Sequence, residues 1–152
     1  VLEFNVRLGD PECQVILPRL ESNLLDYVNH AIDGTLDQLE PLQWSEKCAL
    51  CVVLASKGYP FRYEKGKVIT GLKSNRSRVD NYKDTFVFHA GTAFNEQGQI
   101  VTNGGRVLSV VALAYRMRDA IDKAYRLVNT ISWDGMHYRK DIGLKALRYK
   151  YQ

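Results

Sequence analysis

Glu3, Asn5 and Arg7 are the residues whose types and spacing most suggest chemistry. Apolar residues stand between them, and successive side chains of a β-strand point to opposite faces. The alternation therefore predicts a strand at residues 3–10 that carries a carboxylate, an amide and a guanidinium on one face. Oxygen ligands beside a fixed cation suit Mg²⁺ bound together with a substrate phosphate. The alternative is the solvent-exposed face of an ordinary edge strand.

Gly9 and Asp10 follow this strand, and Pro11 can begin a short helix that ends near residue 17, before Pro18. The N-terminal amides of a helix can face an anion. Asp10 stands where an N-cap residue would accept a hydrogen bond from the first turn. The sequence thus predicts a strand-to-helix turn close to the polar face described above.

Two further polar residues, His89 and Arg106, lie in turns that contain glycine. His89 precedes Ala90-Gly91, and Arg106 follows Gly104-Gly105. Because glycine lets the backbone approach a ligand closely, both side chains are candidates for lining a binding cleft. The alternative is a histidine held by hydrogen bonds within its turn and an arginine on the open surface.

The three cysteines, Cys13, Cys48 and Cys51, cannot all pair with one another, which favours a reducing compartment and a cytoplasmic protein. Cys48 and Cys51 form a C-x-x-C motif, but redox pairs need accessible thiols of low pKa. This motif leads instead into an apolar run. A zinc site would need two more ligands, and no second pair follows. The sequence predicts cysteines that serve packing.

The composition is that of a soluble globular protein, with 45% hydrophobic and 25% charged residues and a net charge of +4. No stretch approaches the ~20 apolar residues that span a bilayer, so no membrane is expected as a partner. Basic residues gather at residues 139–140 and 145–150, which favours a solvated helix face or an anionic small ligand over nucleic acid. The start at Val1, without Met, suggests a piece of a longer chain.

The elements expected around these residues are short strands and a few helices. Apolar runs predict strands at residues 48–56, 68–69, 85–89, 98–102 and 107–113. The sequence Asn103-Gly104-Gly105 predicts a hairpin that joins the last two strands. Residues 73–84 are expected to form a polar loop. We therefore expect an α+β fold in which a small antiparallel sheet is covered by helices.

Helical spacing of apolar residues predicts a helix at residues 23–33, with Ser22 as its N-cap and Gly34 as its C-cap. A second helix is expected at residues 116–131, and a third, short one near the C-terminus. The apolar stripe of the second helix indicates core packing and includes Met117, Ile121, Ala124, Val128 and Ile131. A domain boundary is expected near residue 44, where the chain becomes polar and rich in turns.

Taken together and in order, several sequence motifs resemble those of the glycinamide ribonucleotide synthetase (phosphoribosylamine–glycine ligase) family of ATP-grasp enzymes. The matching motifs cover residues 2–12, 53–60, 65–66, 88–92, 101–108 and 138–143. The resemblance implies that residues 1–44 are the C-terminal end of an ATP-grasp domain. Residues 45–152 would form the family's small C-terminal domain. The N-terminal portion and most of the ATP-grasp portion of such an enzyme would be the missing partners.

The resemblance also implies roles for the residues singled out above. Glu3 and Asn5 would hold Mg²⁺ or Mn²⁺ between the phosphates of the co-substrate ATP, and Arg7 would stabilise charge on the transferring phosphoryl group. Gly9 and Asp10 would border the substrates. Asp10 would either accept a hydrogen bond from the ammonium group of glycine or serve as an N-cap.

His89 and Arg106 would line the side of the cleft that takes 5-phosphoribosylamine. The implied reaction activates glycine as an acyl phosphate and joins it to that amine in purine synthesis. The piece alone is expected to be inactive. The alternative function is a noncatalytic scaffold or polyanion-binding module that works through its basic C-terminus, with a steep dependence on salt.

Overall fold

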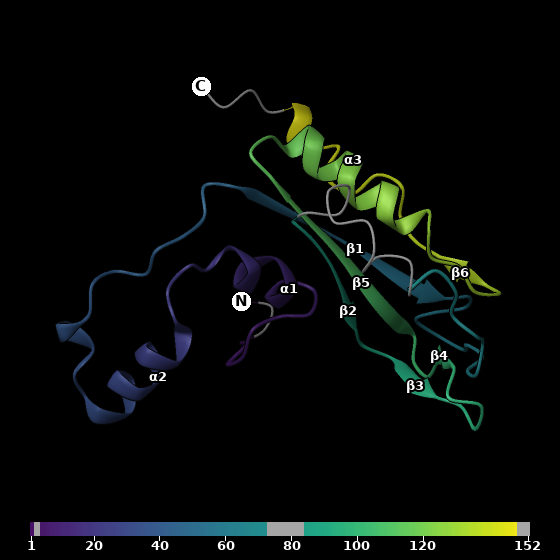
Figure 1. Cartoon of the computed structure of the whole chain (residues 1–152), viewed down its shortest axis with the longest axis horizontal. Helices are drawn as coiled ribbons and strands as arrows, with labels where there is room; N and C mark the ends of the chain where they lie inside the picture. Colours follow the sequence, from purple (N-terminus) through teal and green to yellow (C-terminus); the bar gives the residue numbers. More distant parts are fainter. Residues whose placement is uncertain (2–3, 73–83, 149–152) are drawn as a thin grey trace.

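The computed structural model describes residues 1, 4–72 and 84–148. Its centre is an antiparallel sheet of four strands in the order β2-β5-β1-β6 (Figure 1). The strands are β1 (Cys48–Ser56), β2 (Thr85–His89), β5 (Arg106–Ala114) and β6 (Met136–His137). The long pair β1 and β5 runs from Cys48 opposite Ala114 to Ala55 opposite Arg106, with a register shift at Leu54/Ala55. The fold is α+β, as expected.

The core lies between this sheet and helix α3 (Met117–Val128), which packs on β1 and β5 (Figure 1). Every residue of β5 after Arg106 is buried, so this strand is covered on both faces. The predicted stripe of α3 is confirmed, because Ile121, Ala124 and Val128 are buried against the strands. Contacts to β1 and β5 also come from the short helix α1 (Cys13–Ile16), drawn on the side of the sheet away from α3 (Figure 1).

The hairpin predicted across Asn103-Gly104-Gly105 is wrong. Strand β4 (Ile100–Thr102) pairs with β3 (Thr92–Phe94) in a separate two-stranded sheet, whereas β5 pairs with β1 and β2. The glycines at 104 and 91 serve close backbone approach: a Cβ added to Gly104 would lie 2.9 Å from the Cα of Gly91. The real hairpin turn lies between β3 and β4, where the Asn95 side chain accepts hydrogen bonds from the backbone of Gln97 and Gln99.

The strand predicted at residues 3–10 is also wrong for its described part, residues 4–10, which form no strand. A strand needs a neighbouring strand that satisfies its backbone groups, and none of the described segments forms a β-bridge or β-ladder with residues 4–10. The apolar side chains meant for a buried face are accordingly exposed, Phe4 at 86% and Val6 at 99%. Alternation of residue types alone did not produce a strand here.

The helix predicted at residues 23–33 is α2 (Leu24–Asp33), and a 3₁₀ turn, η2 (Leu36–Gln38), follows it. Gly34 ends α2 in the left-handed region, at φ 70°, as expected. The N-cap is Asn23, whose side chain accepts a hydrogen bond from the backbone of Leu25. Ser22 was the wrong choice because its hydroxyl accepts a hydrogen bond from the backbone of Gln43 instead.

The remaining elements are short. Pro18 lies within the 3₁₀ turn η1 (Leu17–Arg19), and the C-terminal helix is only the 3₁₀ turn η4 (Ala146–Arg148). The strand expected at residues 68–69 is reduced to isolated bridges at Val68 and Thr70. Of the predicted polar loop, residues 73–83 lie outside the described residues. None of the described helices combines the length and apolarity needed to cross a bilayer.

Candidate functional site

Asp10 and Arg106, which stand 96 positions apart in the chain, meet in an ion pair. The Arg106 Nη2 atom lies 3.1 Å from Oδ2 of Asp10, and Nη1 donates a hydrogen bond of 3.2 Å to the backbone carbonyl of the same residue. The two side chains are 42% and 43% exposed. An exposed pair of this kind contributes about 0–1 kcal/mol to stability. Its main effect is to fix the direction of a guanidinium that solvent and ligands can reach.

Gln14 completes this group from the first turn of α1. Its Nε2 atom donates a 3.0 Å hydrogen bond to Oδ1 of Asp10, the carboxylate oxygen that does not face Arg106. The other atom of the amide, Oε1, is buried and has no hydrogen-bond partner among the described residues. The carboxylate of Asp10 therefore lies between an amide donor on one side and a guanidinium on the other.

The turn before α1 differs from the sequence-based expectation. The N-cap of α1 is Glu12, which makes no side-chain capping bond, so the interpretation of Asp10 as an N-cap is wrong. The carbonyl of Gly9 accepts a hydrogen bond from the backbone of Cys13, and a Cβ on Gly9 would overlap the Glu12 carboxylate. With four residues, α1 is too short for its dipole to build an anion site.

His89 ends β2 beside the start of β5. The next two residues, Ala90 and Gly91, donate backbone hydrogen bonds to the carbonyls of Val107 and Arg106, at 3.0 and 2.9 Å. The imidazole Nδ1 of His89 lies 3.1 Å from the hydroxyl oxygen of Thr92. The structure thus places the two predicted glycine turns side by side, and the His89 ring is exposed and held within its own turn.

The residues predicted to handle metal and phosphate are only partly described. Glu3 lies outside the described residues. Asn5 is exposed, and the exposed Arg7 donates a hydrogen bond from Nη1 to the carbonyl of Leu8. Within the described ranges, no group of three or more His, Cys, Asp or Glu residues could hold a metal ion. The metal ligands and the role of Arg7 stay predictions.

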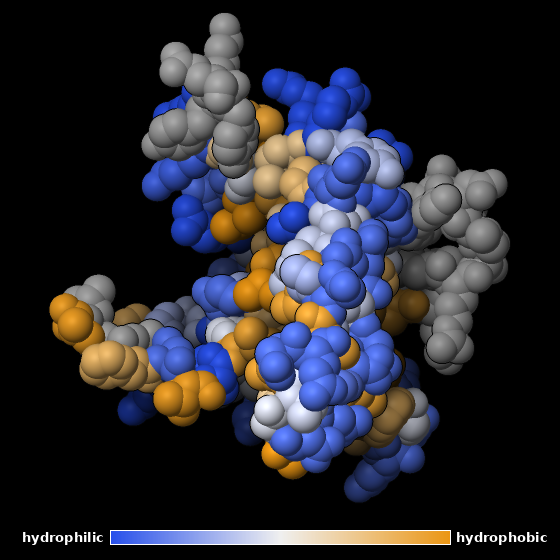
Figure 2. Space-filling view, turned by 90° about the vertical axis from the view of Figure 1, so that its left-hand side faces the viewer, coloured by the Kyte–Doolittle hydropathy of each residue, from blue (hydrophilic) through white to orange (hydrophobic). Residues whose placement is uncertain are grey.

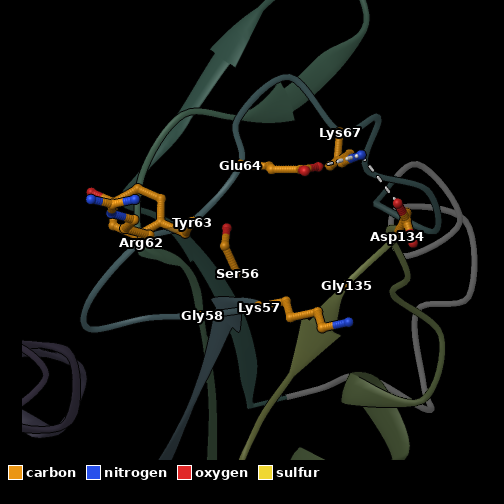
Figure 3. Close-up of a pocket in the computed structure, with 9 residues that line it drawn as sticks. All are labelled: Ser56, Lys57, Gly58, Arg62, Tyr63, Glu64, Lys67, Asp134 and Gly135. Carbon is orange, nitrogen blue, oxygen red and sulfur yellow. Dashed lines mark ion pairs between the residues drawn. The ribbon is translucent and has the colours of Figure 1, made fainter.

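A second concave site opens at the far end of β1, with a volume of about 590 Å³. In Figure 3 the loop after β1 forms one side and the turn before β6 the other. Lys67 joins the two sides, 2.8 Å from the carboxylate of Glu64 and 3.1 Å from that of Asp134. These two hydrogen-bonded carboxylates raise the pKa of Lys67 above its usual value. The lining residues are Ser56, Lys57, Gly58, Arg62, Tyr63, Glu64, Lys67, Asp134 and Gly135.

Sequence reasoning gave no role to Gln14 or to this cavity. The motifs at residues 53–60 and 65–66, which border the cavity, contributed to the family resemblance. They were the only sequence signal that pointed to this cavity. Gly58 explains part of that signal: it has φ +92°, and a Cβ there would overlap the carbonyl of Arg62. Gln14 had no such signal, because its partner Asp10 is identified only by the fold.

The cysteines are free thiols, and all three are partly buried. The Cys48 Sγ atom donates a hydrogen bond of 2.9 Å to the carbonyl of Ala114. Burial raises the pKa of the Cys51 thiol to about 11, against a hydrogen bond to Ser109 that lowers it. A thiol with this pKa is almost wholly protonated at neutral pH, which is the opposite of what a redox pair requires. The prediction of packing cysteines agrees with this geometry.

Comparison with known proteins identifies the class to which this fold and site belong. The family model for the phosphoribosylglycinamide synthetase C domain matches residues 49–145. The chain is therefore a member of the phosphoribosylglycinamide synthetase family, of which it represents the C-terminal portion.

Particular relatives agree with this assignment. A bifunctional purine biosynthetic protein of Dictyostelium discoideum is 52% identical over 149 residues, which is 98% of this chain and 18% of that protein. A phosphoribosylamine–glycine ligase of Caldanaerobacter subterraneus is 48% identical over 93% of this chain and 32% of its own length. The crystal structure of the Thermotoga maritima ligase matches with a TM-score of 0.71 and 38% identity, over 93% of this chain and 32% of that one. The chain thus spans about a third or less of these relatives.

Proposed function

We propose that residues 1–152 are the C-terminal portion of an ATP-dependent ligase that joins glycine to 5-phosphoribosylamine in purine synthesis. The observation that carries this proposal is an identity of about one half over nearly the whole chain to proteins named phosphoribosylamine–glycine ligase. The full-length protein that contains this sequence is called the parent protein below. The products would be glycinamide ribonucleotide, ADP and phosphate.

The reaction has two steps, and basic side chains of this chain would stabilise the negative phosphate groups that take part in them. A carboxylate oxygen of glycine attacks the γ-phosphorus of ATP, and ADP leaves. The amine of 5-phosphoribosylamine then attacks the carbonyl carbon of glycyl phosphate, the C–O bond to phosphate breaks, and the nitrogen loses a proton. We assign Arg106 to the 5-phosphate, because a guanidinium presents planar paired donors to phosphate oxygens. His89 borders the same substrate from the neighbouring turn.

We assign Glu3 and Asn5 as oxygen ligands of Mg²⁺ or Mn²⁺, and Arg7 as a cation near the transferring phosphoryl group. Support comes from the residue types, since carboxylate and amide oxygens are the hard ligands that these ions take. The metal ion would neutralise negative charge on the phosphates of ATP. In the structure, Asn5 and Arg7 are exposed.

Residues 1–44 would be the end of the ATP-grasp domain, and residues 45–152 the C-terminal domain. Exposed apolar side chains support this division, because apolar faces are normally covered in a complete domain. On α2 they form a face of Leu24, Leu25, Val28 and Ile32, which are 42%, 67%, 44% and 78% exposed. We propose that the preceding part of the ATP-grasp domain covers this face. The enzyme would act in the cytoplasm.

The test is product formation by the parent protein. Purified parent protein with ATP, Mg²⁺, glycine and freshly generated 5-phosphoribosylamine should form glycinamide ribonucleotide, and omission of any one substrate should stop ADP release coupled to it. A chain limited to residues 1–152 should form none, because it lacks most of the ATP site. A parent protein that forms no glycinamide ribonucleotide under these conditions would overturn the proposal.

A further inference from the structure

We propose that Gln14 and Asp10 are positioning residues that hold the Arg106 guanidinium in the direction needed to grip the phosphate of the ribosyl substrate. This inference rests on the proposed function, since it concerns the substrate assigned to Arg106. It adds a role for Gln14, and it assigns Asp10 to the arginine instead of to the ammonium group of glycine.

A hydrogen bond and an ion pair link the three side chains, so that each carboxylate oxygen of Asp10 has its own partner. Gln14 Nε2 donates to Oδ1 at 3.0 Å, and Arg106 Nη2 lies 3.1 Å from Oδ2. The Asp10 backbone carbonyl takes a second bond, from Nη1 of Arg106. Two nitrogens of the guanidinium thus face one residue, which fixes both the position and the plane of the group.

The guanidinium keeps donors for a ligand after these contacts are made. A guanidinium has five N–H donors in a rigid fork; Nη1 of Arg106 donates to the Asp10 carbonyl, and Nη2 faces the Asp10 carboxylate. Arg106 is 42% exposed, so the remaining donors are open to an anion from solvent. When a long, flexible side chain is held in place before the ligand arrives, less conformational entropy is lost on binding.

Gln14 is suited to steering the carboxylate because α1 anchors its backbone. The helix contacts β1 and β5, and Arg106 is itself the first residue of β5. The amide is neutral, so it satisfies one oxygen of Asp10 without adding a negative charge beside Arg106. The buried Oε1 of Gln14 has no hydrogen-bond partner among the described residues. This is compatible with an amide that is oriented by the hydrogen bond from its Nε2 atom.

The test is a double-mutant cycle on the parent protein with ribose 5-phosphate as the probe. Gln14→Met keeps the length of the side chain and removes its donor, and Arg106→Ala removes the group through which Gln14 should act. Calorimetry on the wild type, both single variants and the double variant gives the dissociation constant of ribose 5-phosphate. We expect Gln14→Met to weaken binding about threefold to tenfold, the scale of the net contribution of one hydrogen bond.

The decisive comparison is between the two backgrounds. If Gln14 acts through Arg106, Gln14→Met has no further effect once Arg106 is alanine, and the two losses are not additive. Equal losses in both backgrounds would overturn the inference, because they would mark a structural effect. So would unchanged binding in Gln14→Met, or no binding of ribose 5-phosphate by the wild type.

Two further readouts separate this inference from a folding defect and from the proposed function. Gln43→Met is the matched control, since the Gln43 amide is exposed and donates to the local carbonyl of Pro41. It should bind the probe like the wild type.

In the ligase assay, Gln14→Met should raise KM for 5-phosphoribosylamine while KM for ATP and for glycine stays within about twofold of wild type. A parent protein that binds the probe with the expected coupling but forms no product would refute the ligase proposal alone.

Discussion

Arg106 stands at the first position of β5 with a guanidinium that is both held and accessible. Its two contacts to Asp10 join a loop near the N-terminus to the central sheet. Neither contact is buried enough to stabilise the fold by much. The arrangement therefore makes more sense as a prepared binding group than as a stabilising pair, and the chemistry of a guanidinium favours phosphate as its ligand.

At the same scale, Glu3→Ala in the parent protein should lower ligase activity by a factor of about one hundred or more. The expected reason is loss of the proposed oxygen ligand to the metal ion, an electrostatic contact of the kind whose removal has this effect. Steady-state product formation measures it. Glu96→Ala, in the turn between β3 and β4, is the control and should leave the rate unchanged. A normal rate for Glu3→Ala would refute the metal assignment.

Alkylation of Cys51 should be slow at neutral pH and should rise up to about pH 11. Burial raises the pKa of this thiol to about 11, and only the thiolate reacts with iodoacetamide. Because the folded pKa is the higher one, the thiol contributes stability below about pH 9 and loses that contribution as pH rises toward 11. Peptide mass spectrometry across pH 7–11 measures the modification. Full modification of Cys51 within minutes at pH 7 would contradict the account.

At the scale of elements, local signals predicted β1, β2, β5 and α3, because each carries a clear apolar pattern and contributes side chains to the core. The hairpin at residues 103–105 was wrong because its glycines permit close approach to Gly91 instead of a tight turn between paired strands. The strand at residues 3–10 was wrong for its described part, residues 4–10, because alternation cannot supply a neighbouring strand. The contact between Asp10 and Arg106 could not be foreseen, since it depends on how α1 lies on the sheet.

The stability of the loop after β1 should depend on Gly58 more than on Gly66. Gly58→Ala combines a positive φ of +92° with overlap of the new Cβ and the Arg62 carbonyl. We expect a loss of about 2–4 kcal/mol in the free energy of unfolding of the parent protein, from strain and a backbone shift. Urea unfolding measures it.

Gly66→Ala is the matched control for this loop. Gly66 also has a positive φ, +79°, but a Cβ there has open space around it. Its cost should be limited to about 1 kcal/mol of backbone strain. Equal losses at the two positions would contradict the geometry described for the loop.

At the scale of the whole molecule, the chain combines a well-packed sheet domain with an N-terminal region whose apolar groups face outward. Leu54 and Leu108 are fully buried beneath α3, whereas no residue of α2 is buried. Another hollow, of about 400 Å³, opens among Val15, Trp44 and Met117, where α1 meets the sheet. This contrast is what one expects when a domain and part of its neighbour are seen together.

The exposed face of α2 gives a prediction for the parent protein. Ile32→Asp should lower its melting temperature by several degrees, because we expect the preceding domain to bury this side chain and a buried unpaired charge is costly. Asn29→Asp, on an exposed polar position of the same helix, is the control and should change it little. An unchanged melting temperature for Ile32→Asp would mean that the face stays open in the parent protein.

The most direct test of the account is the kinetic effect of Arg106→Gln in the parent protein. This change keeps a polar side chain and removes the charge assigned to the phosphate of 5-phosphoribosylamine. We expect KM for 5-phosphoribosylamine to rise about tenfold or more, the effect of one charge-assisted contact, while KM for ATP and for glycine stays within about twofold. An unchanged KM for 5-phosphoribosylamine, or an equal rise for all three substrates, would contradict the central claim that this domain grips the phosphate of the ribosyl substrate.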